Sequence, residues 1–148
     1  MPVPFIVMPG VAPRPLNVVG EKITVLASGE QTGGYEIFLQ AGPEGSGPPP
    51  HNHPWDESFY VIKGEMALGF DKSDMIAVPG TLVHLPGGTT HWFRFGKGGC
   101  EMVSMTSREG ASRLFTDIDL QISPEKPDVE KLIEIARQHG LVVVRPPN

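Results

Sequence analysis

The sequence predicts an all-β fold, a barrel or sandwich of short antiparallel strands, with one helix near the C-terminus. The 148 residues include 18 glycines and 16 prolines, which lie between short apolar runs and form no low-complexity block. Helical spacing of apolar residues is convincing only near the C-terminus. With 39% hydrophobic and 20% charged residues, the composition is typical of a globular protein with a buried core.

Eight apolar runs, each bounded by Gly, Pro, Asp or Ser, are the predicted strands. They are Lys22–Ala27, Tyr35–Gln40, Glu57–Ile62, Glu65–Phe70, Met75–Val78, Leu82–Leu85, His91–Phe95 and Glu101–Met105. Lys63-Gly64 is predicted to form a tight hairpin between two of these runs, and Asp71–Asp74 and Pro79-Gly80 the next turns. Short strands joined in this way indicate an antiparallel order.

The predicted helix begins after Asp128 as its cap and ends at Gly140. Its apolar side chains recur at helical offsets, at Val129, Leu132, Ile133 and Ala136. Residues 141–144 are expected to return as a last strand or an extended tail, and a short helical turn is a further expectation around Ala111–Phe115. No repeat or linker divides the chain, so we expect one domain over residues 1–148, with the helix and tail at 124–148.

Charge and cysteine content exclude several classes of partner. The chain has 12 Lys and Arg against 17 Asp and Glu, a net charge of -5, so it offers no basic surface for nucleic acid or an anionic membrane. Residues 1–15 are broken by prolines and have no basic start, which fits neither a signal peptide nor a membrane span. Cys100 is the only cysteine, so no intrachain disulfide forms and a cytoplasmic location is expected.

The histidines and one glutamate indicate a metal site. His51 and His53 are one residue apart, so on an extended backbone, which the preceding prolines favour, both imidazoles leave the same face. Glu57 opens an apolar run and shares its face with Phe59, and an unpaired carboxylate there costs several kcal/mol unless a cation or hydrogen bonds compensate. Glu57 could instead face solvent. His91 begins another strand after a Gly-rich turn and supplies a fourth donor.

Three neutral imidazoles and one carboxylate suit one divalent transition metal, and Fe, Mn, Ni, Co, Cu and Zn all remain open. Single histidines are more often structural, and we interpret His84 and His139 in that way. Arg94 has the opposite parity to His91, which favours a surface or interface position. Cys100 is expected to be a small buried hydrophobe.

Two segments resemble the motifs of a known family. Gly45-x5-His51-x-His53-x3-Glu57-x6-Gly64 resembles the first cupin motif, and Gly80-x5-Pro86-x-Gly88-x2-His91 resembles the second. The surrounding sequence is similar to the quercetin-dioxygenase-like branch of small single-domain bacterial cupins. The resemblance implies a double-stranded β-helix, a jelly-roll barrel whose metal is held by His51, His53, Glu57 and His91. Phe95 stands where the second motif usually has Asn, which affects the pocket wall more than the ion.

From this site we expect a metal-dependent dioxygenase-type oxidoreductase acting on a small aromatic or enolisable substrate, with Glu57 accepting the substrate proton. Apolar residues are predicted to line the pocket: Phe59, Met66, Met75, Phe93, Phe95 and Met105. The alternatives are a metal-dependent isomerase or decarboxylase, and a non-catalytic cupin that binds a small ligand. Exposed sheet edges favour a homodimer.

Overall fold

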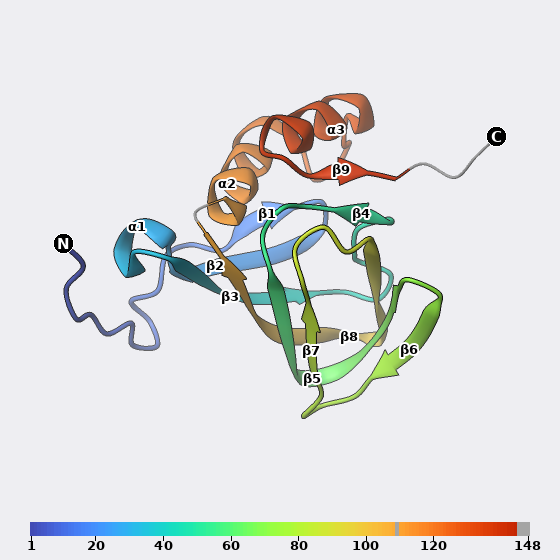
Figure 1. Cartoon of the computed structure of the whole chain (residues 1–148), viewed down its shortest axis with the longest axis horizontal. Coiled ribbons are helices and arrows are strands. Elements are labelled where there is room, and N and C mark those ends of the chain that lie inside the picture. The colour runs from blue at the N-terminus through green and yellow to red at the C-terminus, as the bar shows by residue number, and fades with distance from the viewer. Residues whose placement is uncertain (109, 145–148) are drawn as a thin grey trace.

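The computed structural model describes residues 1–108 and 110–144, and its main feature is a strongly curled antiparallel sheet (Figure 1). The strands are β1 (Leu16–Val18), β2 (Glu21–Ala27), β3 (Tyr35–Gly42), β4 (His51–Asn52), β5 (Glu57–Phe70), β6 (Ser73–Ala77), β7 (Leu82–Leu85), β8 (His91–Ser107) and β9 (Val142–Val143). Within the described residues they follow the order β1-β2-β3-β8-β4-β9, and β5 pairs with β6, β7 and β8. The predicted all-β barrel is confirmed.

Two long strands, β5 and β8, build most of the barrel. The first half of β5 pairs with the second half of β8, from Glu57 opposite Thr106 to Gly64 opposite Cys100. The second half of β5 then pairs with the first half of β8 and ends with Phe70 opposite His91. Each of the two strands therefore runs the length of the barrel with a bend, and each contributes residues to both ends of the barrel.

The predicted hairpin at Lys63-Gly64 is wrong, because the backbone continues through it as one strand with register shifts on either side. Residues 96–100 likewise belong to β8 and do not separate two strands. The turn within Asp71–Asp74 is confirmed, since Phe70 pairs with Ser73 across it. Pro79-Gly80 does form a turn, but the strands on either side of it, β6 and β7, both pair with β5.

Successive side chains of the long strands point alternately into the barrel and out of it. Phe59, Val61, Met66 and Leu68 of β5 lie in one buried cluster together with Phe93 and other apolar residues of β8. Burying a large apolar side chain contributes about 1.5–3 kcal/mol, so this cluster stabilises the barrel.

Helices cover one end of the barrel, above β1 and β4 in Figure 1. They are α2 (Ala111–Gln121) and α3 (Val129–Gln138), and a short helix, α1 (Gly29–Thr32), lies in the β2–β3 connection. The cap of α3 is confirmed, because the Asp128 carboxylate accepts a hydrogen bond from the Lys131 N–H at 3.1 Å. The expected short turn at Ala111–Phe115 is only the first part of α2, and α1 was not predicted. No helix of the described chain has the length and apolar composition needed to cross a bilayer.

A second apolar cluster joins these helices to the sheet. Leu114 and Ile118 of α2 and Ile135 of α3 pack with Ile23 of β2 and Phe38 of β3. The expected strand after the last helix is present as β9, which pairs with β4, while residues 145–148 of the predicted tail lie outside the described residues. The helices are thus fixed beside the strand that carries His51.

Candidate metal centre

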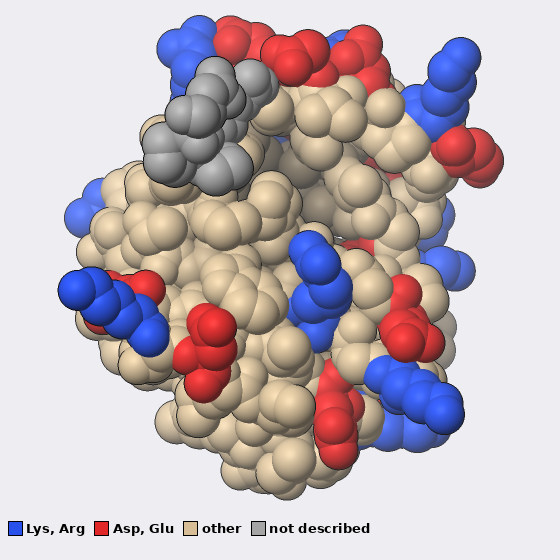
Figure 2. Space-filling model, turned by 90° about the vertical axis from the view of Figure 1, so that its right-hand side faces the viewer, with Lys and Arg blue, Asp and Glu red and all other residues tan. Residues whose placement is uncertain are grey.

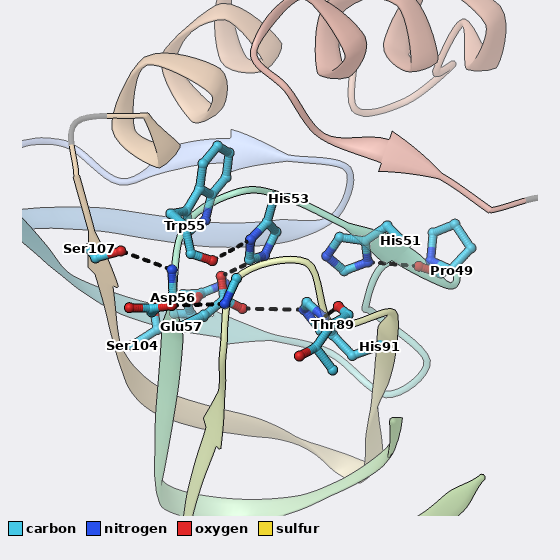
Figure 3. A network of polar contacts seen from close by, with 12 residues as sticks. Pro49, His51, His53, Trp55, Asp56, Glu57, Thr89, His91, Ser104 and Ser107 are labelled. Carbon is cyan, nitrogen blue, oxygen red and sulfur yellow. Dashed lines mark hydrogen bonds and ion pairs between the residues drawn. The ribbon is translucent and has the colours of Figure 1, made fainter. Parts of the chain in front are cut away.

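The strand pairing brings the four predicted ligands together from two separate segments. His51 on β4 is the register partner of His91 at the start of β8, His53 follows β4, and Glu57 is the first residue of β5. All four are buried. One nitrogen from each imidazole lies within 4.8 Å of the others, and the four side chains gather beneath the helices (Figure 3).

Backbone carbonyls set the orientation of each imidazole. The Nδ1 atoms of His51, His53 and His91 lie 2.9, 3.0 and 2.8 Å from the carbonyl oxygens of residues 49, 55 and 89. A carbonyl oxygen only accepts, so each Nδ1 donates its hydrogen and a neutral ring presents a bare Nε2 lone pair. This arrangement is the usual support of a metal-binding histidine.

The Glu57 carboxylate lies between two of these rings. Its Oε2 is 3.3 Å from His53 Nε2, and its Oε1 is 3.7 Å from His91 Nε2. Neither Nε2 has a hydrogen-bond partner among the described residues, although both are buried. A lone pair facing a carboxylate is stable only with a cation between them, so this donor set fits a divalent transition metal.

Burial and neighbouring charges shift the pKa values at the site. Burial by itself raises the pKa of Glu57, but the proximity and charge of His53 and His91 outweigh it and bring the pKa down to about 2. Burial, with the charge of His91, lowers the pKa of His51 to about 4. Burial opposes protonation of His91 too, yet the nearby Glu57 carboxylate raises its pKa overall. Glu57 is therefore ionised and His51 neutral near pH 7, as metal binding requires.

A cavity of about 380 Å³ opens onto this centre. His51, His53 and Glu57 lie on its wall, and Glu21 and Gln40 add the remaining polar side chains. The helical side is apolar and comes mainly from α2, α3 and the segment after them: Leu114, Phe115, Ile118, Val129, Leu132, Ile133, Ala136, Leu141 and Val143. Figure 2 shows a hollow beneath the acidic upper rim of one face. The cavity thus combines one polar end with an apolar body.

The structure places the six predicted pocket residues in three different environments. Phe93 lies on the cavity wall, whereas Phe59, Met66 and Phe95 are buried in the barrel cluster and are not part of that wall. The prediction is wrong for Met75 and Met105, which are 46% and 45% exposed. Met75 is on β6, which pairs only with β5 in the described chain, and Met105 points outward between the buried residues Ser104 and Thr106.

Side chains that were interpreted as structural lie away from the centre. His84 is exposed and lies 2.8 Å from the Ser58 hydroxyl, and His139 pairs with Asp117 at 2.6 Å on the surface. Arg94 is exposed and Cys100 is buried, as their strand positions indicate.

Trp55 packs directly on the site, because its ring stacks on His53 with centroids 4.5 Å apart.

Sequence reasoning missed Glu21 and Gln40. Both are buried, and Gln40 Nε2 donates to Glu21 Oε1 at 3.2 Å on the cavity wall. One signal was present in the sequence. Glu21 has the same parity as Ile23, so if Ile23 points into the protein, Glu21 does too.

Comparison with known proteins agrees with this geometry. Residues 38–106 match the family model described as the cupin domain. This match identifies residues 38–106, just under half of the chain, as a cupin domain. This cupin is 31% identical over 97 residues to quercetin 2,3-dioxygenase of Bacillus subtilis (strain 168). That alignment covers 64% of this chain but only 29% of the dioxygenase, so the chain spans less than a third of that relative's length.

Solved structures share the cupin fold at lower sequence identity. An RmlC-like cupin from Shewanella frigidimarina NCIMB 400 has a TM-score of 0.63 and 15% identity, covering 71% of this chain and 91% of its own. KdgF from Halomonas sp. has a TM-score of 0.58 and 18% identity, covering 64% and 85%. The DMSP lyase DddQ from Ruegeria pomeroyi DSS-3 has a TM-score of 0.54 and 20% identity, covering 60% and 47%. These proteins have different names and are at most 20% identical to this chain. Their similarity therefore shows that the fold is shared and does not indicate a function.

Proposed function

We propose that this cupin is a metal-dependent dioxygenase-type oxidoreductase that acts on a small aromatic or enolisable molecule. One observation carries the proposal: three imidazoles with bare Nε2 atoms and an ionised carboxylate converge at the polar end of an apolar cavity. The similarity to a quercetin 2,3-dioxygenase supports the same reading.

His51, His53, Glu57 and His91 would hold the ion. A divalent transition metal bound there would supply Lewis-acid and redox chemistry toward a substrate oxygen and dioxygen. The carbonyl contacts at each Nδ1 keep the rings in the binding tautomer without the metal. The protein is therefore organised for the ion before it binds, and little side-chain movement is needed.

Glu57 is the residue that we assign to accept the substrate proton. Its carboxylate is ionised and lies on the cavity wall, where a substrate hydroxyl can reach a carboxyl oxygen. Loss of that proton leaves the substrate electron-rich and more easily oxidised. The apolar wall from α2 and α3 excludes water from the body of the substrate, which strengthens these polar interactions.

Oxygen uptake tests the proposal. The protein should be reconstituted separately with Fe, Mn, Ni, Co, Cu and Zn and assayed with flavonols, catechols and diketones. We expect uptake with at least one metal and loss of uptake in Glu57→Gln, while His84→Ala, an exposed histidine variant, stays active. Absence of uptake in every combination would refute the dioxygenase. Saturable binding without a product would then favour the ligand-binding alternative.

The expected homodimer, cytoplasmic location and single domain remain proposals. Tyr60 and Leu82 are cross-strand partners on the outside of the barrel and are 48% and 65% exposed, which supports an apolar contact with a second copy. A single buried cysteine is compatible with a reducing compartment. The apolar cluster shared by sheet and helices supports one domain. Light scattering after size-exclusion chromatography tests the dimer, which a monomer mass would exclude.

A further inference from the structure

The cavity contains a second glutamate that the metal centre does not use. Glu21 begins β2, is buried, and lies on the same wall as His51, His53 and Glu57. A two-residue turn places it there, with Val18 paired to Glu21 and with Val19 and Gly20 at φ of 50° and 91°. Valine rarely adopts a positive φ, so the turn holds Glu21 at this position despite local strain.

A chain of hydrogen bonds fixes one end of the Glu21 carboxyl. The Ser104 hydroxyl donates to Gln40 Oε1 at 2.5 Å, which directs the amide nitrogen of Gln40 toward Glu21. Gln40 Nε2 then donates to Glu21 Oε1 at 3.2 Å. Three strands contribute one residue each, and all three side chains are buried. Oε1 is therefore occupied as an acceptor.

The other end of the carboxyl has no partner in the protein. No hydrogen bond or ion pair among the described residues uses Oε2 of Glu21, although the side chain lies on the cavity wall. A buried acid without a cation is stable as the neutral carboxylic acid, which has an O–H to donate. With Oε1 accepting from Gln40, that hydrogen belongs on Oε2.

The pKa values of the two glutamates of the cavity are shifted in opposite directions. Burial, opposed by the Gln40 hydrogen bond and reinforced by the charge of Glu57, raises the pKa of Glu21 to about 8. Two carboxyl groups whose pKa values are moved apart in one cavity serve different purposes, one as an anion and one as a hydrogen-bond donor.

We propose that Glu21 donates a hydrogen bond to an acceptor oxygen of the bound ligand, with Gln40 and Ser104 as positioning residues. The ligand is then a mainly apolar molecule with at least two oxygens, one for the metal centre and a carbonyl, ether or hydroxyl oxygen for Glu21. This inference rests on the proposed function, because it places the substrate in the same cavity. Flavonols have this chemistry, since an apolar ring system carries adjacent oxygens.

Calorimetric titration of metal-loaded protein with quercetin, without oxygen, tests the inference. Glu21→Gln keeps an acceptor for Gln40 and an N–H donor for the ligand, so its affinity at pH 7 should stay within about threefold of the wild type. Glu21→Leu keeps neither, and its affinity should fall about tenfold, as loss of one hydrogen bond predicts. Ser104→Ala should give an intermediate loss. Glu65→Gln, an exposed glutamate variant, should match the wild type.

A pH series adds a measurement that a merely structural role would not change. Wild-type affinity should fall as pH rises and Glu21 loses its proton, whereas Glu21→Gln should lack this step. The other titratable groups on the cavity wall, Glu57, His51 and His53, are the same in both proteins, so the difference isolates Glu21. Metal content and melting temperature of each variant check that the site and the fold are intact.

Each outcome decides one of the two proposals. Equal affinity of folded, metal-loaded Glu21→Leu and the wild type would overturn the role of Glu21. Glu21-dependent binding without oxygen uptake in the assays above would leave this inference standing and refute the dioxygenase. No quercetin binding by the wild type would overturn the inferred ligand class.

Discussion

Three backbone carbonyls determine the chemistry of the candidate metal centre at the scale of single residues. Each accepts the Nδ1 hydrogen of one histidine, and so each leaves Nε2 bare for a ligand. The Glu57 carboxylate completes the set between His53 and His91. These contacts make metal affinity depend on individual side chains, which substitutions can test.

Replacing His51 should remove the metal and leave the fold intact. His51→Ala eliminates one of three imidazoles, and we expect metal affinity to fall at least about tenfold. Elemental analysis of the purified variant measures this loss, and circular dichroism checks folding. His84→Ala is the matched control, because that histidine is exposed and bonds to Ser58. Retained metal in His51→Ala would contradict the ligand assignment.

The raised pKa of Glu21 predicts a particular pH dependence of stability. The pKa of its carboxyl is about 8 in the fold against an ordinary 4.5, so unfolding releases a proton between these values. The free energy of unfolding of metal-free protein should therefore fall as pH rises through this window, by on the order of a few kcal/mol.

Denaturant titrations at pH 5, 7 and 9 measure the effect against Glu21→Gln, which has no proton to release. His51 acts in the opposite direction below pH 6.5, because its pKa is lowered to about 4 in the fold. The comparison with Glu21→Gln cancels that contribution. The same pH slope in both proteins would show that Glu21 is not a buried neutral acid.

At the scale of elements, β5 and β8 position the site by running through the whole barrel. Continuity of β5 depends on Gly64, which has a φ of 79° and lies against β8 so closely that a Cβ would be 2.1 Å from the Gly99 carbonyl oxygen. The bend there lets one strand carry Glu57 at one end and pair Phe70 with His91 at the other. A side chain at this position has no space.

Gly64→Ala should therefore be strongly destabilising, by about 3 kcal/mol or more, because it combines backbone strain with a collision against the neighbouring strand. Gly80→Ala is the matched control. Gly80 also has a positive φ, 91°, but its Cβ would meet nothing within 4 Å, so strain alone should cost about 1 kcal/mol. Equilibrium urea unfolding measures both values. Equal effects would mean that the close approach to Gly99 does not matter.

At the scale of the whole molecule, the cavity lies where two apolar clusters meet. One cluster fills the barrel, and the other joins β1, β2 and β3 to α2 and α3. The side chains of the candidate metal centre lie on the barrel side of the cavity, and residues of α2 and α3 form its apolar wall. Figure 3 shows these side chains beneath the helices. We therefore expect folding of the barrel, docking of the helices and binding of the proposed metal to be coupled.

This coupling predicts that removing the metal destabilises the entire protein. An ion that binds only the folded state adds about 2.7 kcal/mol at a hundredfold excess over its Kd. Chelation should then lower Tm by roughly 5–10 °C, since 1 kcal/mol shifts Tm by about 2–4 °C at this size. Differential scanning calorimetry measures the shift, and His51→Ala should show none. An unchanged Tm after verified metal removal would contradict the site.

Local patterns in the sequence predicted the four side chains of the candidate metal centre and determined the capped C-terminal helix. His51 and His53 share a face because strands alternate, and Glu57 points inward because Phe59 does. The Asp128 cap and the helical spacing after it involve only neighbours along the chain. Such features are readable because covalent geometry fixes them within a few residues.

The tertiary structure alone decided which distant segments meet. Gly64 in a bent continuous strand and Gly64 in a hairpin look the same in sequence, because both need a positive φ. The pairing of His51 with His91, the location of Glu21 beside the centre and the apolar wall from α2 and α3 depend on contacts between residues far apart in the chain. Packing of the whole barrel sets those contacts, and no local pattern encodes them.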